Sequence, residues 1–340
     1  MRFISIIVIA LFAYNYSSGQ GCCSGGAGSP IAGGAATGVL QKNQMEFSAI
    51  YQHSKSNKFF TGDHYTDPLF NNFHSNYLYF RIDYGMSDKL TISVASGYYL
   101  NKTLNELESD KELSSEGIGD LLIIPRYDIY NKTKNKKQTE ITLGMGLKIP
   151  LGSHSESYLV FTHPTVGDVY TILPPTVQTS TGSNDFLFNA FFFRGYQVKK
   201  LRVFANSIYI RKGYNDLGIK FGDYASLGLF IGKTFFGNLG ITMQVKGEWV
   251  GKMEAGEGID LLAEYNIDQE STGSRKIFFV PQISYTVKSL TGFVTSEIPL
   301  YQHLEGTQIG SQYQLTFGLS YRFFVKKPIP EVELQNSEFN

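Results

Sequence analysis

This sequence of 340 residues has few cysteines and tryptophans and no excess of charge of either sign. Its 30 basic and 30 acidic residues cancel, so it offers nucleic acid no large cationic surface. Outside a short N-terminal stretch it has no apolar run of roughly 20 residues, which argues against membrane-spanning helices. The mean hydropathy of -0.14 resembles that of a soluble protein. A transmembrane β-barrel also fits these values, because it distributes its apolar residues in alternation.

The only two cysteines, Cys22 and Cys23, are adjacent in the sequence. Neighbouring cysteines form a disulfide only with strained geometry, so the pair is not a folding framework. Lipidation of Cys22 and binding of a soft metal by both thiols stay open as alternatives. A metal site would be incomplete, because no histidine lies near the pair in the sequence. No cofactor is expected.

The first residues predict a signal peptide, residues 1–19. Arg2 supplies a positive charge, residues 3–14 form a short apolar core, and small residues precede Gln20. Export across the inner membrane follows. The next segment, residues 20–44, is rich in glycine and poor in large apolar residues, so we expect it to lie in the periplasm or to enter the barrel as a small plug.

Strict period-two alternation dominates the remaining chain. In residues 140–149, Ile141, Leu143 and Met145 share one face, whereas Glu140, Thr142 and the glycines share the other. Residues 77–84, 239–249 and 313–323 alternate in the same way. Only a β-strand places successive side chains on opposite faces.

The same template predicts twelve strands, near residues 45–53, 75–84, 90–99, 119–130, 139–149, 185–194, 201–210, 224–234, 239–249, 276–286, 290–299 and 313–324. Short and long connections alternate between them. An even number of strands, with tight periplasmic turns and long external loops, is typical of a bacterial outer-membrane barrel. The fold class predicted is therefore all-β, a transmembrane antiparallel up-and-down β-barrel of about twelve strands over residues 45–324. Pro125 and Pro281 fall inside strands, where we expect a bulge or a break.

The charged face of each strand must point inward, because a lysine or arginine facing mid-bilayer lipid costs roughly 2–4 kcal/mol. Cross-strand pairs of these charges would form a network in the lumen. Such a network either lines a polar constriction for a solute or fills the lumen and stabilises the wall; both readings stay open. The predicted lumen-lining residues are Glu46, Arg81, Asp83, Arg126, Asp128, Lys148, Lys246, Glu248, Glu297 and Arg322.

Several short segments, in this order, resemble one family of outer-membrane barrels, named for the meta-pathway of phenol degradation. The matching segments are residues 84–90, 117–120, 148–152, 174–176, 182–185, 221–223, 298–302 and 319–323. The resemblance covers roughly residues 45 to 324. It implies kinship with outer-membrane channels for fatty acids and aromatic hydrocarbons, and therefore passive uptake of hydrophobic small molecules.

We therefore expect a porin-like barrel in the outer membrane of a Gram-negative cell, in contact with lipid and lipopolysaccharide, that transports or captures a hydrophobic or amphipathic small molecule. It would not be an enzyme. The barrel-assembly machinery would recognise residues 314–324, and residues 325–340 would form a periplasmic tail. One alternative is a closed barrel that is structural or docks a partner. A remote one is a lipid hydrolase built on His74 and Ser75, which alternation places on opposite faces.

Overall fold

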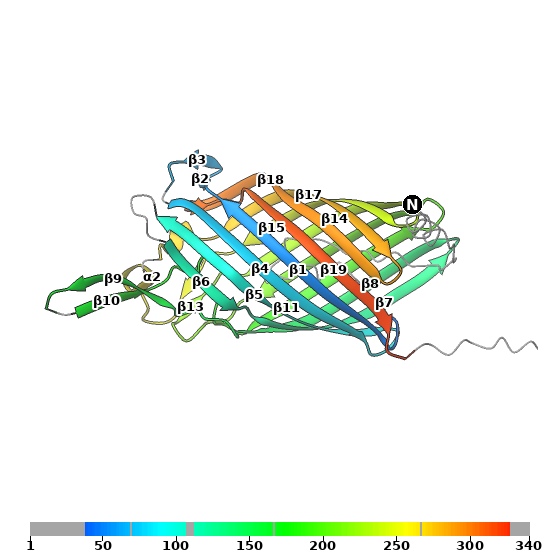
Figure 1. Cartoon of the computed structure of the whole chain (residues 1–340), viewed down its shortest axis with the longest axis horizontal. Coiled ribbons are helices and arrows are strands. Elements are labelled where there is room, and N and C mark those ends of the chain that lie inside the picture. Colours follow the sequence, from blue (N-terminus) through cyan, green and yellow to red (C-terminus); the bar gives the residue numbers. More distant parts are fainter. Residues whose placement is uncertain (1–37, 69, 107–111, 166, 266, 327–340) are drawn as a thin grey trace, which may run out of the picture.

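Twelve long antiparallel strands close into a barrel in the computed structural model, which describes residues 38–68, 70–106, 112–165, 167–265 and 267–326 (Figure 1). The strands are β1 (Gln44–Ser56), β4 (Phe70–Gly85), β5 (Leu90–Glu106), β7 (Leu121–Lys134), β8 (Lys137–Ile149), β11 (Asp185–Tyr196), β12 (Leu201–Arg211), β14 (Tyr224–Phe235), β15 (Leu239–Val250), β17 (Ser274–Val287), β18 (Leu290–Ile309) and β19 (Tyr313–Phe324). Each of the twelve predicted strands overlaps one of them. The all-β barrel prediction is confirmed.

Each strand pairs with its neighbours in the chain, and β1 closes the ring by pairing with β19. Gln44 lies opposite Phe324 at one end of this closing ladder, and Lys55 lies opposite Tyr313 at the other. Closure matters because strands in lipid cannot satisfy their backbone groups from water, and only a ring leaves no free edge.

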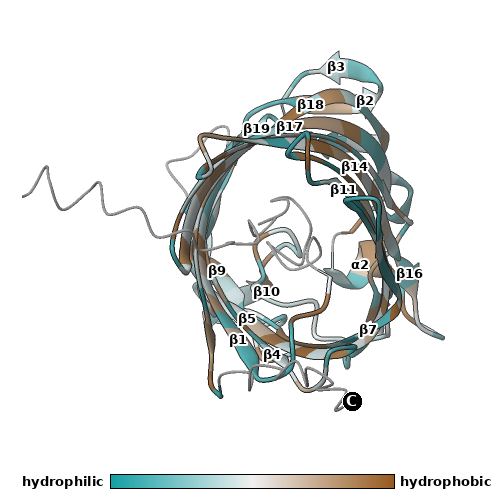
Figure 2. Cartoon of the chain, turned by 90° about the vertical axis from the view of Figure 1, so that its right-hand side faces the viewer, coloured by the Kyte–Doolittle hydropathy of each residue, from teal (hydrophilic) through white to brown (hydrophobic). Residues whose placement is uncertain are grey.

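The two ends of the barrel differ. At the turn end, tight connections join β4 to β5, β7 to β8, β11 to β12, β14 to β15 and β17 to β18. The turn after β7 has Asn135 at a φ of 51° and Lys136 at 58°, as a two-residue hairpin of type I′ requires. The twelve-strand ring itself is seen end-on in Figure 2, where loop segments cross its opening.

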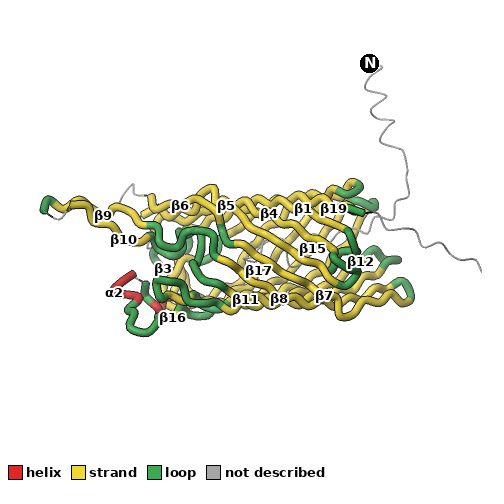
Figure 3. Tube along the Cα trace, turned by 90° about the horizontal axis from the view of Figure 1, so that it is seen from below, coloured by secondary structure: helices red, strands yellow, loops and turns green. Residues whose placement is uncertain are grey.

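At the opposite, loop end the long connections carry further structure (Figure 3). These elements are β2 (Phe59–Gly62), β3 (His64–Thr66), β6 (Glu112–Ile118), β9 (Ser157–His163), β10 (Gly167–Ile172), β13 (Ile219–Lys220), β16 (Glu254–Ala255), α2 (Leu261–Tyr265) and η2 (Gln269–Ser271). The β9 and β10 hairpin projects beyond the barrel wall (Figure 1). No helix among the described residues is long and apolar enough to cross a membrane.

Alternation sorts the side chains of the wall. Leu143 and Met145 on β8 are exposed on the outside, 46% and 61%, whereas Thr142 and Lys148 of the same strand are buried inside. Among aromatic residues near the strand ends, Tyr98, Tyr130, Trp249 and Tyr285 are likewise exposed, whereas Tyr84 is partly buried. An apolar outer surface of this extent is typical of a barrel whose outside faces lipid.

Both prolines interrupt a ladder. The pairing of β7 with β8 skips from Ile123 to Arg126 around Pro125. The pairing of β17 with β18 skips from Phe279 to Gln282 around Pro281. Proline has no backbone N–H to donate, so the expected break occurs at each position.

Candidate functional site

A segment of the longest loop turns back over the loop end of the lumen. We call residues 177–183, in the connection between β10 and β11, the mouth segment. Val177 and Ser183 are completely buried, which is unusual for a loop residue. The sequence analysis treated this connection only as a long external loop, and its position at the mouth is a finding of the structure.

Apolar packing holds the start of the mouth segment. Val177 and Leu173 pack against Leu104 of β5 and Leu113 of β6 in a buried cluster. Two hydrogen bonds to backbone carbonyls add to this contact: Lys102 Nζ donates to Gln178 O over 2.7 Å, and the Ser115 hydroxyl donates to Val177 O. The loop is therefore fixed to the wall formed by β5 and β6.

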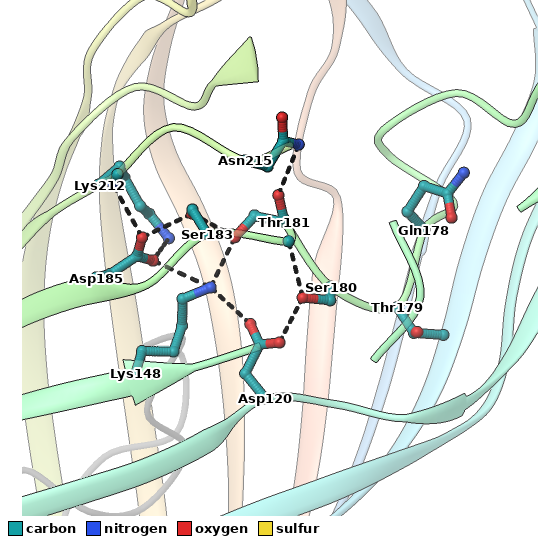
Figure 4. Close-up of polar contacts among 12 residues, drawn as sticks. Asp120, Lys148, Gln178, Thr179, Ser180, Thr181, Ser183, Asp185, Lys212 and Asn215 are labelled. Carbon is teal, nitrogen blue, oxygen red and sulfur yellow. Dashed lines mark hydrogen bonds and ion pairs between the residues drawn. The ribbon is translucent and has the colours of Figure 1, made fainter. Parts of the chain in front are cut away.

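The far end of the mouth segment is held by polar contacts with the adjacent part of the wall, at the loop ends of β7 and β8 (Figure 4). Ser180 Oγ donates to Asp120 Oδ1 over 2.5 Å, and Lys148 Nζ donates to Thr181 Oγ1 over 2.6 Å. From the next loop, Asn215 Nδ2 donates to Thr181 O over 3.0 Å. The segment is thus bonded at the mouth to the wall from β5 to β8 and to the loop that follows β12.

Four charges accompany these hydroxyl groups, and we call them the mouth network: Asp120, Lys148, Asp185 and Lys212. Lys148 Nζ lies 2.7 Å from Asp120 Oδ2 and 3.1 Å from Asp185 Oδ2. Lys212 Nζ, beyond the end of β12, lies 3.1 Å from the same Asp185 oxygen. Burial lowers the pKa of Lys212 and the Asp185 carboxylate opposes that effect. The charges alternate in sign and compensate one another at the mouth.

A second network lies near the turn end and contains five of the predicted lumen-lining residues. Arg81 Nε donates to Asp83 Oδ2 over 2.6 Å, and Arg126 donates to the other Asp83 oxygen over 2.8 Å. Glu46 joins it, since its two oxygens accept from Arg81 over 3.3 Å and from Arg322 Nε over 2.6 Å. We call these residues the turn-end network. They come from β1, β4, β7 and β19, so the network ties strands across the barrel closure.

A third group lies on the wall formed by β15 and β18. Lys246 Nζ lies 2.6 Å from Glu297 Oε1 and 2.8 Å from Glu248 Oε1. Tyr224 Oη donates to Glu248 over 2.8 Å. Of the ten predicted residues, nine therefore lie in three ion-pair groups, with Lys148 in the mouth network.

Asp128 is the tenth predicted residue. It is buried, and its Oδ1 accepts from the Tyr130 backbone N–H over 3.2 Å. Its neighbour on the same face, Arg126, forms its ion pair across the sheet with Asp83 instead. The bulge between Asp128 and Tyr130 shifts the register there, which strict alternation does not foresee.

Asp120, Asp185 and Lys212 were not predicted from the sequence as lumen residues. Asp120 lies within the predicted strand 119–130 and shares the alternation of Arg126 and Asp128, so the same pattern would have placed it inside the barrel. Asp185 begins a strand whose residues are apolar on both faces, and there alternation gives no orientation. Lys212 lies in a loop and carries no periodic signal.

The interior of the barrel also contains a buried apolar cluster, which was not predicted from the sequence. Ile50, Tyr79, Leu187, Ile208 and Phe293 point inward from five strands and are almost fully buried in one cluster. Towards the turn end, the Phe204 and Phe230 rings stack at 4.2 Å beside Phe191. A lumen with polar ends and an apolar centre differs from the polar interior usual in water-filled barrels.

The remaining candidates of the sequence analysis are not assembled into a site in the described chain. His74 Nδ1 lies 3.4 Å from Asn72 Oδ1, whereas the hydroxyls of Ser75 and Ser54 lie 3.5 Å apart. Cys22 and Cys23 lie outside the described residues, as does the predicted signal peptide. Within the described ranges no group of three or more histidine, cysteine or carboxylate residues could hold a metal ion.

Comparison with known proteins gives the fold. No protein-family model matches the chain. No curated protein matches it either. Among solved structures, an outer-membrane channel from Pseudomonas putida F1 aligns with a TM-score of 0.63 at 11% identity, covering 84% of this chain and 97% of that one. The β-domain of the Bordetella autotransporter BrkA aligns with a TM-score of 0.46 at 9% identity, covering 83% and 100%. The chain has the fold of an outer-membrane β-barrel.

Proposed function

We propose that this protein is a passive outer-membrane channel for a hydrophobic or amphipathic small molecule, with the mouth segment as its constriction. The observation that carries the proposal is the mouth segment itself. Its residues are bonded to the loop ends of the neighbouring strands β5, β7 and β8, so a solute that enters the lumen passes hydroxyl groups and compensated charges. In this assignment the turn end faces the periplasm and the loop end faces the outside.

The residues inside the barrel support the proposal that the solute is hydrophobic or amphipathic. Below the mouth, the interior of the barrel holds the buried apolar cluster around Tyr79 and Leu187 and, towards the turn end, the stacked Phe204 and Phe230 rings. Apolar contacts of this kind favour a solute with an apolar body over a sugar or an inorganic ion. The polar mouth network, in contrast, suits a molecule that also carries a polar group.

Planar-bilayer recording and liposome uptake test this proposal. In one variant, which we call the gate variant, a Gly-Ser linker of equal length replaces residues 176–181. The control variant lacks residues 160–169, in the projecting hairpin of the same loop. We expect the gate variant to conduct more current and to admit larger solutes, and the control to match the wild type. If all three proteins seal the bilayer and admit no solute, the channel proposal is wrong and a closed barrel is the better reading.

A further inference from the structure

A pocket lies at the loop end, between the connection that follows β12 and the connection that follows β15. It has a volume of about 590 Å³ and is open to solvent. Its lining includes two phenol rings, Tyr214 and Tyr265, and two carboxylates, Asp216 and Glu257, with Leu217 and Ile259 beside them. Small-molecule sites measure roughly 300–1,000 Å³ and combine apolar walls with a few polar groups. None of the described residues that line this pocket is a lysine or an arginine.

The pocket has a rigid base. Ile219, Met253, Leu261 and Ile267 form a buried apolar cluster beneath the two loops. The short ladder of β13 and β16 joins them, with Ile219 opposite Ala255. Gly256 N also donates to Gly218 O over 2.7 Å. A site whose loops are already packed loses little conformational entropy when it binds a ligand.

Some side chains that line the pocket are held by hydrogen bonds, and others are free to contact a ligand. Tyr265 Oη donates to Leu217 O over 3.1 Å, which holds one ring in place. The Tyr214 ring is about half exposed. Glu257 has no hydrogen-bond or ion-pair partner among the described residues, whereas Lys220 is already paired with Glu254 over 2.8 Å. A ligand cation would therefore find one carboxylate without a competing lysine.

Asp216 completes the negative side of the pocket. Its Oδ1 lies 2.5 Å from His154 Nε2, and this hydrogen bond lowers the pKa of the Asp216 carboxyl. The carboxylate is thus ionised at neutral pH. Two carboxylates beside two phenol rings attract a cation, because the ring faces are electronegative.

We infer that this pocket binds an organic cation with an apolar body, such as an alkylammonium or quaternary ammonium compound. The ammonium group lies between Glu257, Asp216 and the Tyr214 ring, and the apolar body lies against Leu217 and Ile259. Anions and neutral compounds of the same shape bind more weakly, since they lose the charge and ring contacts. The inference does not depend on conduction by the barrel.

The test uses the full chain folded in detergent micelles, with benzyltrimethylammonium as the probe and calorimetry as the readout. We expect the probe to bind to one site and benzoate, which has the same ring, not to bind. Glu257→Gln should weaken binding about three- to tenfold, and Tyr214→Ala about three- to fivefold. Glu116→Gln removes an exposed carboxylate outside the pocket and is the matched control, expected to bind as the wild type does.

Folding of each variant is checked by its shift in gel mobility on boiling, so that loss of binding is not confused with loss of the barrel. Equal binding of benzyltrimethylammonium and benzoate would overturn the inference. Unchanged affinity in Glu257→Gln would overturn it as well. Either result leaves the channel proposal standing, whereas sealed bilayers with normal probe binding contradict only the channel proposal.

Discussion

Lys148 Nζ lies 2.7 Å from Asp120 Oδ2, inside the barrel wall at the loop end, and it also donates to Thr181 of the mouth segment. One ammonium group therefore joins β8, the start of β7 and the inserted loop. Its side chain is 8% exposed, so water contributes little to its solvation. We therefore expect the position of the mouth segment to depend on this residue more than on any exposed loop charge.

Replacing Lys148 by alanine should open the mouth. Breaking a buried ion pair by removal of one partner costs about 3–5 kcal/mol, because the remaining carboxylate loses its compensation. We expect a lower free energy of unfolding in lipid vesicles and a larger single-channel current. Lys220→Ala removes a partly exposed pair with Glu254 at the rim and should change stability by about 0–1 kcal/mol. Equal currents in Lys148→Ala and the wild type would contradict the role of the network.

Asp83 anchors the turn-end network, and its removal should destabilise the barrel. Two buried guanidinium groups, Arg81 and Arg126, bond to its oxygens, and both would lose this partner in Asp83→Ala. The expected loss is about 3–5 kcal/mol in urea unfolding from vesicles. Lys89→Ala, in the exposed turn that follows β4, serves as the control and should unfold as the wild type does. A loss below 1 kcal/mol in Asp83→Ala would refute a stabilising network.

A charged residue on the lipid-facing side of the barrel should lower the free energy of unfolding by an amount that depends on its depth in the membrane. Met145 lies mid-strand on the outside, so Met145→Lys should cost about 2–4 kcal/mol. Tyr285 lies near the end of β17, and Tyr285→Lys should cost about 0–1 kcal/mol, because a lysine there reaches the interface. Urea unfolding of both variants in the same vesicles gives the comparison. Equal costs at both positions would mean that the outer surface does not cross a bilayer as we describe.

The contact between His154 and Asp216 should respond to acid. Since the hydrogen bond from His154 lowers the pKa of Asp216, its stabilising effect is present above the ordinary value of 3.8 and is lost as the pH falls below it. Carbon-13 NMR of the Asp216 carboxyl group should show a midpoint below 3.8 in the wild type. In His154→Phe the midpoint should rise towards that value. A midpoint that does not move would show that the contact does not form in solution.

Alternation alone predicted much of the fold and part of the candidate site. The strand near residues 139–149 illustrates why: from residue 140 to residue 149 its apolar residues lie on one face and its polar residues and glycines on the other, so the membrane side and the lumen side follow from the residues themselves. Pro125 and Pro281 were correctly expected to interrupt pairing, since the missing N–H is a local property. In contrast, residues 185–194 are apolar on both faces, and the inward orientation of Leu187 and Phe191 emerged only from the register with β8 and β12.

The sequence by itself determined which residues form strands, which side of most strands meets lipid, and where the short and long connections lie. These properties depend on residues two positions apart, which any strand must separate. The tertiary structure alone decided that residues 177–183 lie at the mouth, that Ser180 meets Asp120 across 60 positions of the chain, and that Tyr214 and Glu257 share one pocket. Such contacts follow from closure of the ring and packing of its loops, which no periodic pattern along the chain records.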